Sequence, residues 1–376
     1  MKITFLVERP TQFEAPFYRF AARDPEHELR VLYTGADVAE PVFDPELGRA
    51  VSWGIDLLGG YPYEICPQNG AEAWLAERLR PERCDLAIVN GYTQPLYRLG
   101  ARTAKRAGVA TALRLDSVLW DSSKLRILAK RLLFATYMRR TYDLFLGVGG
   151  LTWRYLQAFG VPWAQMGLFP YAVDVEEFRS RSSQADRGTM RERLGIPPGA
   201  RVVLGLAKFN DREAPWDLLR AFARVQGEDV WLVLAGDGPA RPRLESAARG
   251  EGLARVRFPG YVPYPELPAL YAASDLFVHP AREERWGVSV QEALACGLPV
   301  VVSSRVGAGY DLIAVGGNGF VYPVGDPESL AFHIQEALAL PPERVRERSR
   351  EILARWDYAA VWRNLLEAAS RVARKP

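Results

Sequence analysis

Two glutamates, Glu284 and Glu292, stand with seven residues between them in the stretch REERWGVSVQEALACGLPVVVSS, residues 282–304. The preceding run DLFVHPA is typical of a buried strand, and GVSVQEALACG predicts a helix that begins near Gly287 and ends at Gly297. We therefore expect Glu284 in the loop that enters a helix and Glu292 on the early turns of that helix.

These residue types at this spacing suit a ligand that combines a phosphate with polyols. A glycine at a helix start lets a ligand approach unpaired backbone N–H groups, whose partial positive charge suits a phosphate. A carboxylate beside such a site can accept hydrogen bonds from ribose or sugar hydroxyls. Either glutamate alone reads as an ordinary surface charge, but the pair, together with Gly287 and the ACGLPVV turn, favours a nucleotide-sugar site.

Length and composition limit the classes of protein. A chain of 376 residues is long for one hydrophobic core, so two domains are expected. The net charge of +3 is too small to indicate nucleic acid as the main partner. Cys66, Cys84 and Cys296 are widely spaced, which favours reduced thiols in a cytosolic protein. The opening residues MKITFLVERP lack the regions of a signal peptide, and no run reaches about 18 apolar residues. We expect a cytoplasmic protein and leave peripheral contact with the inner face of a membrane open.

Short apolar runs alternate with amphipathic stretches, which predicts parallel strands joined by helices. The expected strands are ITFLVE, LRVLYT, DLAIVN, VATALRL and DLFLGVG in the first half and RVVLGLA, DVWLVLAG, VRFPGYV, DLFVHPA, LPVVVSS and GFVYPV in the second. Residues 179–200 are polar and rich in Ser, Gly and Pro, which predicts a linker. The fold class is therefore α/β with two Rossmann-like domains, and ligands are expected beyond the C-terminal strand ends, in a cleft between the domains.

Several motifs in order resemble family 4 retaining glycosyltransferases, which have the two-domain GT-B fold. EERWGVSVQEALACGLPVVVS is similar to that family's E-x7-E motif, with Trp286 in place of the usual phenylalanine. FPYAVDVEEF, LVLAGDGPARPRLESAA, VRFPGYVPYPELPALYAASDLFVHPA and VGAGYDLIAVGGNGFVYPVGDPESLA continue the pattern. The resemblance implies an acceptor-binding domain over residues 1–180, a donor-binding domain over 200–356, and a helix within 357–376 that crosses back to the first domain.

The resemblance also implies roles in the donor site. Glu284 is expected to hold hydroxyls of the donor sugar, and Glu292 the ribose of the nucleotide. Backbone N–H groups of Gly287, Val288 and Ser289 would face the diphosphate or sugar, and Tyr261 and Val262 would flank the base.

The two cations that neutralise the leaving diphosphate in this family show a departure here. LGLAKFNDREAPWDLL supplies Lys208 at the first place, preceded by Ala207 where relatives carry glycine. The second family lysine aligns with Glu213, an acid that cannot do that work. Arg212 turning in as a substitute is the favoured explanation, and a one-residue shift of the alignment or a different donor are the alternatives.

The first domain is expected to meet the acceptor through loops that follow its strands. LRLDSVLWDSS puts Asp116 after a strand as the candidate for a hydroxyl contact or proton acceptor, and a turn or N-cap aspartate is the alternative. Val118 stands where relatives often have a histidine, which removes a histidine-based role there. The other acceptor-side candidates are Arg9, Gln12, Phe13, Gly91, Tyr92, Arg114 and Ser117.

A basic stretch at helical spacing, KLRILAKRLLFATYMRR, covers residues 124–140. One interpretation is the solvated face of a packed helix. The other is an electrostatic contact with anionic lipid or an anionic acceptor.

Together these features predict a retaining hexosyltransferase that uses a nucleotide diphosphate sugar and an acceptor hydroxyl in a front-face reaction. Its catalytic candidates are Glu284, Lys208, Arg212 and Asp116. No Cys/His cluster has metal-ligand spacing, and the resemblance implies metal-independent transfer without a cofactor, a UDP-sugar being favoured over a GDP-sugar. The acceptor is a sugar, a glycolipid or a small molecule. The alternatives are a sugar-nucleotide epimerase or phosphorylase of the same fold, or a non-catalytic sugar-nucleotide-binding subunit.

Overall fold

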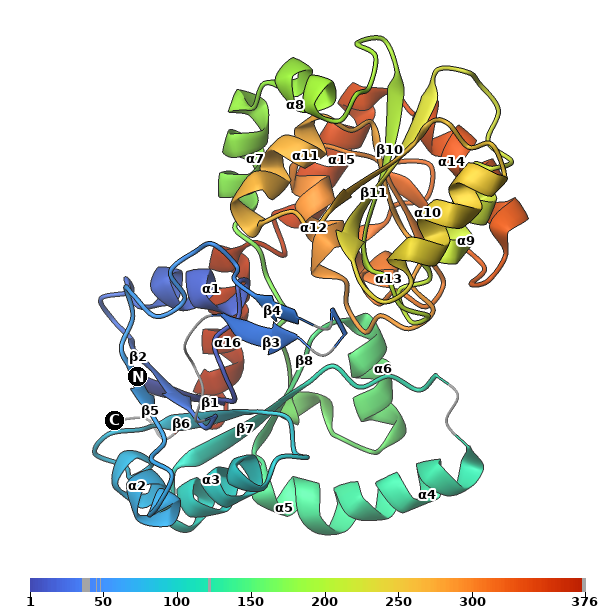
Figure 1. The fold of residues 1–376 in the computed structure, drawn as a ribbon. Helices are drawn as coiled ribbons and strands as arrows, with labels where there is room; N and C mark the ends of the chain where they lie inside the picture. The colour runs from blue at the N-terminus through green and yellow to red at the C-terminus, as the bar shows by residue number, and fades with distance from the viewer. Residues whose placement is uncertain (36–40, 45, 48, 121–122, 374–376) are drawn as a thin grey trace. The chain divides into compact units, whose positions relative to one another are not determined.

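The chain folds into two α/β units in the computed structural model, which describes residues 1–376 except 36–40, 45, 48, 121–122 and 374–376 (Figure 1). The first unit comprises residues 1–39, 56–172 and 356–376. The second comprises residues 40–55 and 173–355. None of the helices in the described part of the chain has the length and apolarity that crossing a membrane requires.

The first unit is built on a seven-stranded parallel sheet. Its strand order is β5 (Tyr63–Ile65), β2 (Glu28–Tyr33), β1 (Lys2–Val7), β6 (Leu86–Asn90), β7 (Ala110–Leu115), β8 (Leu144–Gly147) and β9 (Met166–Leu168). The helices of this unit include α1 (Glu14–Ala21), α2 (Ala71–Arg78), α3 (Pro95–Arg106) and α6 (Gly150–Ala158). Strands β1, β6, β7 and β8 are buried along almost their whole length, as expected for a parallel sheet covered by helices.

The second unit has a six-stranded parallel sheet. Its order is β12 (Val256–Gly260), β11 (Val230–Asp237), β10 (Arg201–Lys208), β13 (Leu276–His279), β14 (Val300–Ser303) and β15 (Gly319–Tyr322). Its helices include α9 (Pro215–Phe222), α10 (Arg241–Gly250), α11 (Leu267–Ala272), α12 (Val288–Ala295), α13 (Ala308–Leu312), α14 (Pro327–Leu338) and α15 (Pro342–Leu353). The expected α/β class with two parallel-sheet units is confirmed.

The stretch 179–200, predicted to be a linker, is mostly helical. It carries the end of α7 (Val175–Gln184) and all of α8 (Arg187–Arg193). The side chain of Asp186 caps α8 by accepting from two backbone N–H groups, and α7 packs against α11 and α12. The polar composition of this stretch predicted a linker without regular structure. Helices form there because they are capped and packed against other helices, which residue propensity alone does not reveal.

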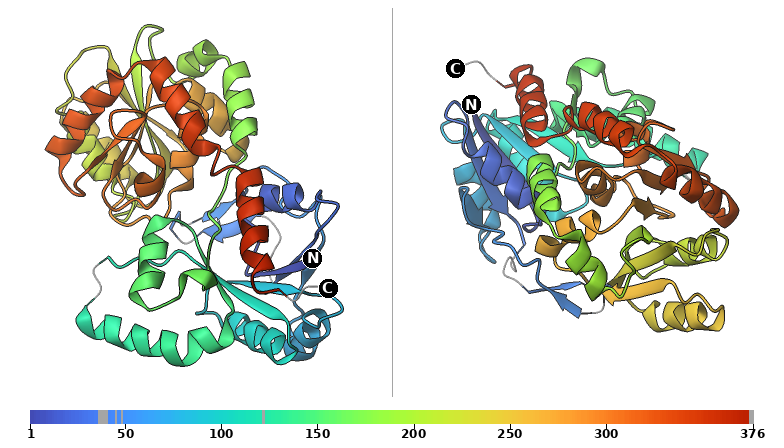
Figure 2. Two further views of the ribbon diagram at one scale, coloured as in Figure 1. Left: turned by 180° about the vertical axis from the view of Figure 1, so that it is seen from behind. Right: turned by 90° about the horizontal axis from the view of Figure 1, so that it is seen from above.

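The last helix, α16 (Tyr358–Ser370), belongs to the first unit, as the returning helix was expected to do. The Tyr358 ring lies 5.6 Å from that of Phe17, and the Trp362 indole donates to Asp24 at 2.7 Å. Figures 1 and 2 show α16, in red, beside the blue helix α1. A side chain at Gly167 in β9 would come within 2.8 Å of the Ala368 Cβ atom, so the helix lies close against the sheet.

A two-stranded antiparallel hairpin, absent from the sequence predictions, joins the second unit. It consists of β3 (Val42–Asp44) and β4 (Arg49–Val51), and we call residues 42–51 the acidic hairpin. The basic stretch 124–140 is helical as expected, with α4 (Lys124–Leu133), a π-helical turn (Phe134–Met138) and α5 (Arg139–Thr141) in succession.

Candidate functional site

The candidate site of the second unit lies at the carboxyl ends of β10 and β13, which are neighbours in the sheet. Lys208 is the last residue of β10 and His279 the last of β13. Ala207 pairs with Gly236, whose added Cβ atom would lie only 1.8 Å from the Ala207 carbonyl oxygen. The two backbones therefore approach closely at the end of the strand that presents Lys208.

Helix α12 begins at the predicted glycine. Gly287 is its N-cap with φ +98°, and an added Cβ atom would lie 3.1 Å from a Val306 methyl group. Both facts favour glycine, and a glycine at the N-cap supplies no side chain to cap the N–H groups of the first turn. Val288 and Ser289 lie in the first turn of α12, which is where backbone N–H groups can face an anion.

Glu292 lies on α12, with its carboxylate in a buried position. It accepts a hydrogen bond from the Tyr271 hydroxyl at 2.8 Å. Burial raises the pKa of Glu292 to about 7, and the Tyr271 hydrogen bond offsets only part of that rise. Its proton is therefore held more tightly than that of an exposed glutamate.

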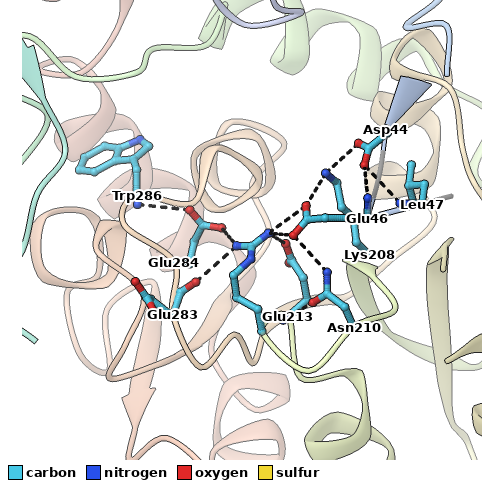
Figure 3. Close-up of polar contacts among 10 residues, drawn as sticks. Asp44, Glu46, Leu47, Lys208, Asn210, Glu213, Glu283, Glu284 and Trp286 are labelled. Carbon is cyan, nitrogen blue, oxygen red and sulfur yellow. Dashed lines mark hydrogen bonds and ion pairs between the residues drawn. The ribbon is translucent and has the colours of Figure 1, made fainter. Parts of the chain in front are cut away.

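Glu284 precedes α12 in a loop that pairs with Val306. One carboxylate oxygen accepts from the backbone N–H of Trp286 at 3.4 Å, and the other accepts from Arg212 at 3.3 Å. The Trp286 side chain is buried, so the tryptophan fills a core position and leaves Glu284 half exposed beside the helix start (Figure 3).

The Arg212 guanidinium donates to the Glu284 carboxylate at 3.3 Å, and its substitution for the family lysine stays a prediction. The same guanidinium also donates to Glu213 at 2.7 Å. Glu213 itself is buried, and its backbone N–H donates to the side-chain oxygen of Asn210 at 2.9 Å. Burial raises the pKa of Glu213, while His279 and Arg212 work against that rise.

Glu213, His279 and Glu284 bring their potential ligand atoms within 4.8 Å of one another. This set offers one nitrogen and two oxygen donors of the kind that divalent cations accept. His279 is buried, and within the described chain neither of its ring nitrogens has a hydrogen-bond partner. Arg212 contacts both carboxylates, so a protein cation already compensates their charge.

Lys208 is held by two acids of the acidic hairpin. Its ammonium lies 2.8 Å from Asp44 and 2.7 Å from Glu46 (Figure 3). Burial would lower the pKa of Lys208, but these two hydrogen bonds outweigh it and the pKa is raised. The hydrogen bond from Lys208 is the main reason that the pKa of Glu46 lies below its ordinary range. All three groups are therefore charged at neutral pH.

Tyr261 and Val262 follow β12 and are half-buried, at the positions expected to flank a base. The Tyr261 hydroxyl donates to the Ser52 carbonyl oxygen at 3.3 Å. Ser52 comes directly after the acidic hairpin, so that part of the chain contacts Tyr261 as well as Lys208 and Arg212.

In the first unit, the acceptor-side candidates follow β1, β6 and β7, three neighbours in the sheet. Arg114 nevertheless has a different role from the predicted one. It is buried, pairs with Glu14 at 2.7 Å, and donates to the carbonyls of Phe169 at 3.3 Å and Pro170 at 3.0 Å. Its guanidinium carbon also lies 4.4 Å from the Tyr171 ring centroid. Because its donors are used inside the unit, Arg114 positions the strand ends rather than facing an acceptor.

The other acceptor-side candidates remain near the surface. Asp116 accepts from the Tyr171 hydroxyl at 3.4 Å, and Phe13 meets the Tyr171 ring edge-on at 5.3 Å. Gly91 has φ +102°, a value that favours glycine after β6. Arg9 is exposed, whereas Gln12, Tyr92 and Ser117 are half-buried.

Comparison with known proteins agrees with this geometry. Residues 186–352 match the family model "Glycosyl transferases group 1". This part of the chain is a group 1 glycosyltransferase domain. It contains Lys208, Glu284 and Glu292 together with all strands of the second sheet, and the resemblance to family 4 enzymes is confirmed.

Curated relatives match this chain over about half of its length. The alpha-D-kanosaminyltransferase of Streptomyces kanamyceticus is 30% identical over 179 residues, which are 47% of this chain and 45% of the relative. A GDP-mannose-dependent alpha-(1-6)-phosphatidylinositol monomannoside mannosyltransferase of Mycolicibacterium smegmatis is 33% identical over 199 residues, 50% of each chain. The chain spans about half the length of the curated relatives it matches.

The fold is shared over the full chain with solved structures. Anabaena Alr3699/HepE in complex with UDP superposes with a TM-score of 0.75 at 20% identity, covering 99% of this chain and 100% of the other. That likeness shows the GT-B fold.

Some site residues were missed by sequence reasoning. Asp44 and Glu46 carry no motif, and their link to Lys208 spans more than 160 positions of the chain. Glu14 was missed for the same reason, since its partner Arg114 is 100 positions away. The sequence did carry a signal at Glu213. Because this acid aligns with a family lysine, a nearby cation such as Arg212 could be expected to compensate its charge.

Proposed function

We propose that this protein is a retaining glycosyltransferase that moves a hexose from a nucleotide diphosphate sugar to an acceptor hydroxyl. The observation that carries the proposal is the convergence of Lys208, Arg212, Glu284 and the start of α12 at neighbouring strand ends. A phosphate is attracted by the two cations and the helix start, and a polyol by the carboxylates. A UDP-sugar is the favoured donor over a GDP-sugar, and no cofactor takes part.

The chemistry asked of the site is stabilisation of a departing diphosphate. Lys208 and Arg212 neutralise its charge while the N–H groups of Val288 and Ser289 donate hydrogen bonds to its oxygens, so the stabilisation is prepared before reaction. The leaving phosphate oxygen takes the proton of the incoming hydroxyl on the same face of the sugar, which retains the anomeric configuration. Glu284 holds sugar hydroxyls and Glu292 the ribose; they are not a glycosidase acid/base pair.

The test uses purified protein with labelled UDP-, GDP- and ADP-sugars and a panel of sugar, glycolipid and small-molecule acceptors. Acceptor-dependent release of nucleotide diphosphate, with NMR showing the donor's anomeric configuration in the product, is the expected result. An isomerised donor would instead identify an epimerase. Phosphate-dependent formation of a sugar phosphate would identify a phosphorylase, and donor binding without turnover would identify a non-catalytic subunit.

Metal independence is part of the proposal, because protein cations occupy the donor site. Transfer should persist in excess EDTA with Lys208 and Arg212 intact. If EDTA abolished transfer and a divalent ion restored it, the enzyme would need a metal. Glu213, His279 and Glu284 would then be the candidate ligands.

A membrane-surface location in the cytoplasm is proposed from α4. Leu125, Leu128 and Leu132 are 77%, 65% and 65% exposed, and their spacing places them along one face of the helix. The same stretch of sequence carries six cations and no Asp or Glu from residue 124 to 142; the cations are Lys124, Arg126, Lys130, Arg131, Arg139 and Arg140. Exposed leucines flanked by cations fit the headgroup boundary of an anionic bilayer.

Sedimentation with vesicles tests this surface. The protein should bind vesicles containing phosphatidylglycerol and not pure phosphatidylcholine vesicles. A Leu125→Ser, Leu128→Ser, Leu132→Ser variant should lose that binding. Phe332→Ser, which removes a 58% exposed side chain from α14, is the control and should bind as the parent does. Equal binding by both variants would refute the surface.

A further inference from the structure

The cations proposed to receive the donor's diphosphate are already engaged by the chain itself. Asp44 and Glu46 lie 2.8 and 2.7 Å from the Lys208 ammonium, and Glu46 lies 3.3 Å from the Arg212 guanidinium. In Figure 3 the Glu46 carboxylate lies between the Lys208 ammonium and Glu284, and Asp44 lies on the far side of that ammonium. Two carboxylates therefore present their oxygens to this pair of cations, as a diphosphate would.

The hairpin turn fixes the direction of these acids. The Asp44 carboxylate accepts from the backbone N–H groups of Glu46 and Leu47 at 2.9 and 3.2 Å. An aspartate that accepts from backbone N–H groups two and three residues on has its side chain oriented by that turn. These hydrogen bonds therefore help to orient the Asp44 carboxylate that contacts Lys208.

A second contact ties the same segment to the other end of the donor site. Ser52 follows β4 directly and its carbonyl accepts from the Tyr261 hydroxyl at 3.3 Å. Gly54 then lies against Pro265, beyond Tyr261 in the same loop region. Residues 42–54 thus contact both the diphosphate cations and the position proposed to flank the base.

We propose that the acidic hairpin is a gate on the donor site, in which Asp44 and Glu46 compete with the diphosphate of a nucleotide for Lys208 and Arg212. The inference rests on the proposed function, since it needs a diphosphate-binding site there. A diphosphate brought beside two ionised carboxylates would meet like charge at short range, so the hairpin must release the cations when the donor binds. The apparent affinity for the donor is lowered by the cost of this release.

The experiment measures the affinity of UDP, GDP and uridine by calorimetry for the parent and for an Asp44→Asn, Glu46→Gln variant. Both changes keep side-chain shape and remove charge. The ion pairs removed by these changes are partly exposed, so each contributes only modestly to holding the hairpin on the cations. We therefore expect the variant to bind its preferred nucleotide diphosphate about three- to tenfold more tightly than the parent. Uridine, which carries no phosphate, should bind equally to both. Glu228→Gln, at an exposed acid distant in sequence from the site, is the control and should match the parent.

The outcomes separate the gate from alternatives. Weaker nucleotide binding by the variant would show that the acids help to build the site, and unchanged binding would show that they do not compete; either overturns the gate. Tighter binding of uridine as well would indicate a steric effect and also overturns it. If neither nucleotide binds to any of the proteins, the proposed function fails and the gate fails with it. Thermal unfolding of each variant checks that the fold is kept. Hydrogen exchange supplies a second readout, because UDP should speed exchange in residues 49–52 of the parent.

Discussion

Each unit places an arginine beside a glutamate at the strand ends of its sheet, and the two pairs are used in opposite ways. In the first unit Arg114 and Glu14 have side chains only 4% and 7% exposed. In the second, Arg212 and Glu284 are 38% and 25% exposed and share their contacts with Glu46 and Glu213. A buried pair that loses one partner leaves an uncompensated charge, whereas a half-exposed network can exchange partners at small cost. The first pair holds structure and the second can receive a ligand.

The largest expected effect is on the buried pair. Glu14→Ala should lower the free energy of unfolding by about 3–5 kcal/mol, because Arg114 would remain charged and buried. Urea titration measures it. As the matched control, Glu351→Gln removes an exposed partner of Arg348 and should change stability by less than about 1 kcal/mol. Similar losses in both variants would erase the contrast between buried and exposed pairs.

The second prediction concerns the exchangeable pair. Arg212→Met should lower kcat for transfer by about 10²–10³-fold, since the cation acts on charge that develops in the transition state, while the unfolding free energy changes little. Lys208→Met should behave in the same way. A large loss of stability with unchanged kcat would make these residues structural, like Arg114.

Glu292 combines features of both pairs: it is buried like Glu14, but its partner is the neutral hydroxyl of Tyr271. Glu292→Gln should weaken binding of free nucleotide diphosphate by about 1.5–3 kcal/mol through loss of a charge-assisted hydrogen bond to the ribose. Calorimetry with UDP and GDP measures the change. Equal affinity in variant and parent would exclude the ribose contact.

The smallest effect is a pH dependence that the same residue creates. Burial raises the pKa of Glu292 to about 7, so the folded protein holds this proton more tightly than the unfolded chain does. The resulting stability is complete below the ordinary glutamate pKa and is lost as pH rises through about 7. The melting temperature of the parent, relative to that of Glu292→Gln, should therefore fall as pH rises from 5 to 8. Above pH 8 the difference between the two should be constant. A difference independent of pH would contradict the assignment.

Local sequence patterns predicted much of the second unit. The spacing around Gly287 predicted α12 with its glycine N-cap, and the alternation of apolar runs predicted the parallel strands, because both depend on neighbouring residues. The role of Arg114 could not be predicted in this way. A charged residue at a strand end looks the same in sequence whether it faces solvent or a partner 100 positions away. The acidic hairpin was missed for a similar reason, since long-range ion pairs leave no periodic signal.

The return of α16 to the first unit has a consequence for biosynthesis. The core of that unit needs the contacts of Tyr358 with Phe17 and of Trp362 with Asp24, which join the two ends of the chain. On the ribosome, residues 173–355 emerge as one continuous run and can pack their sheet before α16 is made, whereas the sheet of the first unit lacks that helix until then. The first unit to be translated is therefore the last to be completed. Until Trp362 has been synthesised, the apolar surface of the first unit that α16 later covers is exposed to solvent.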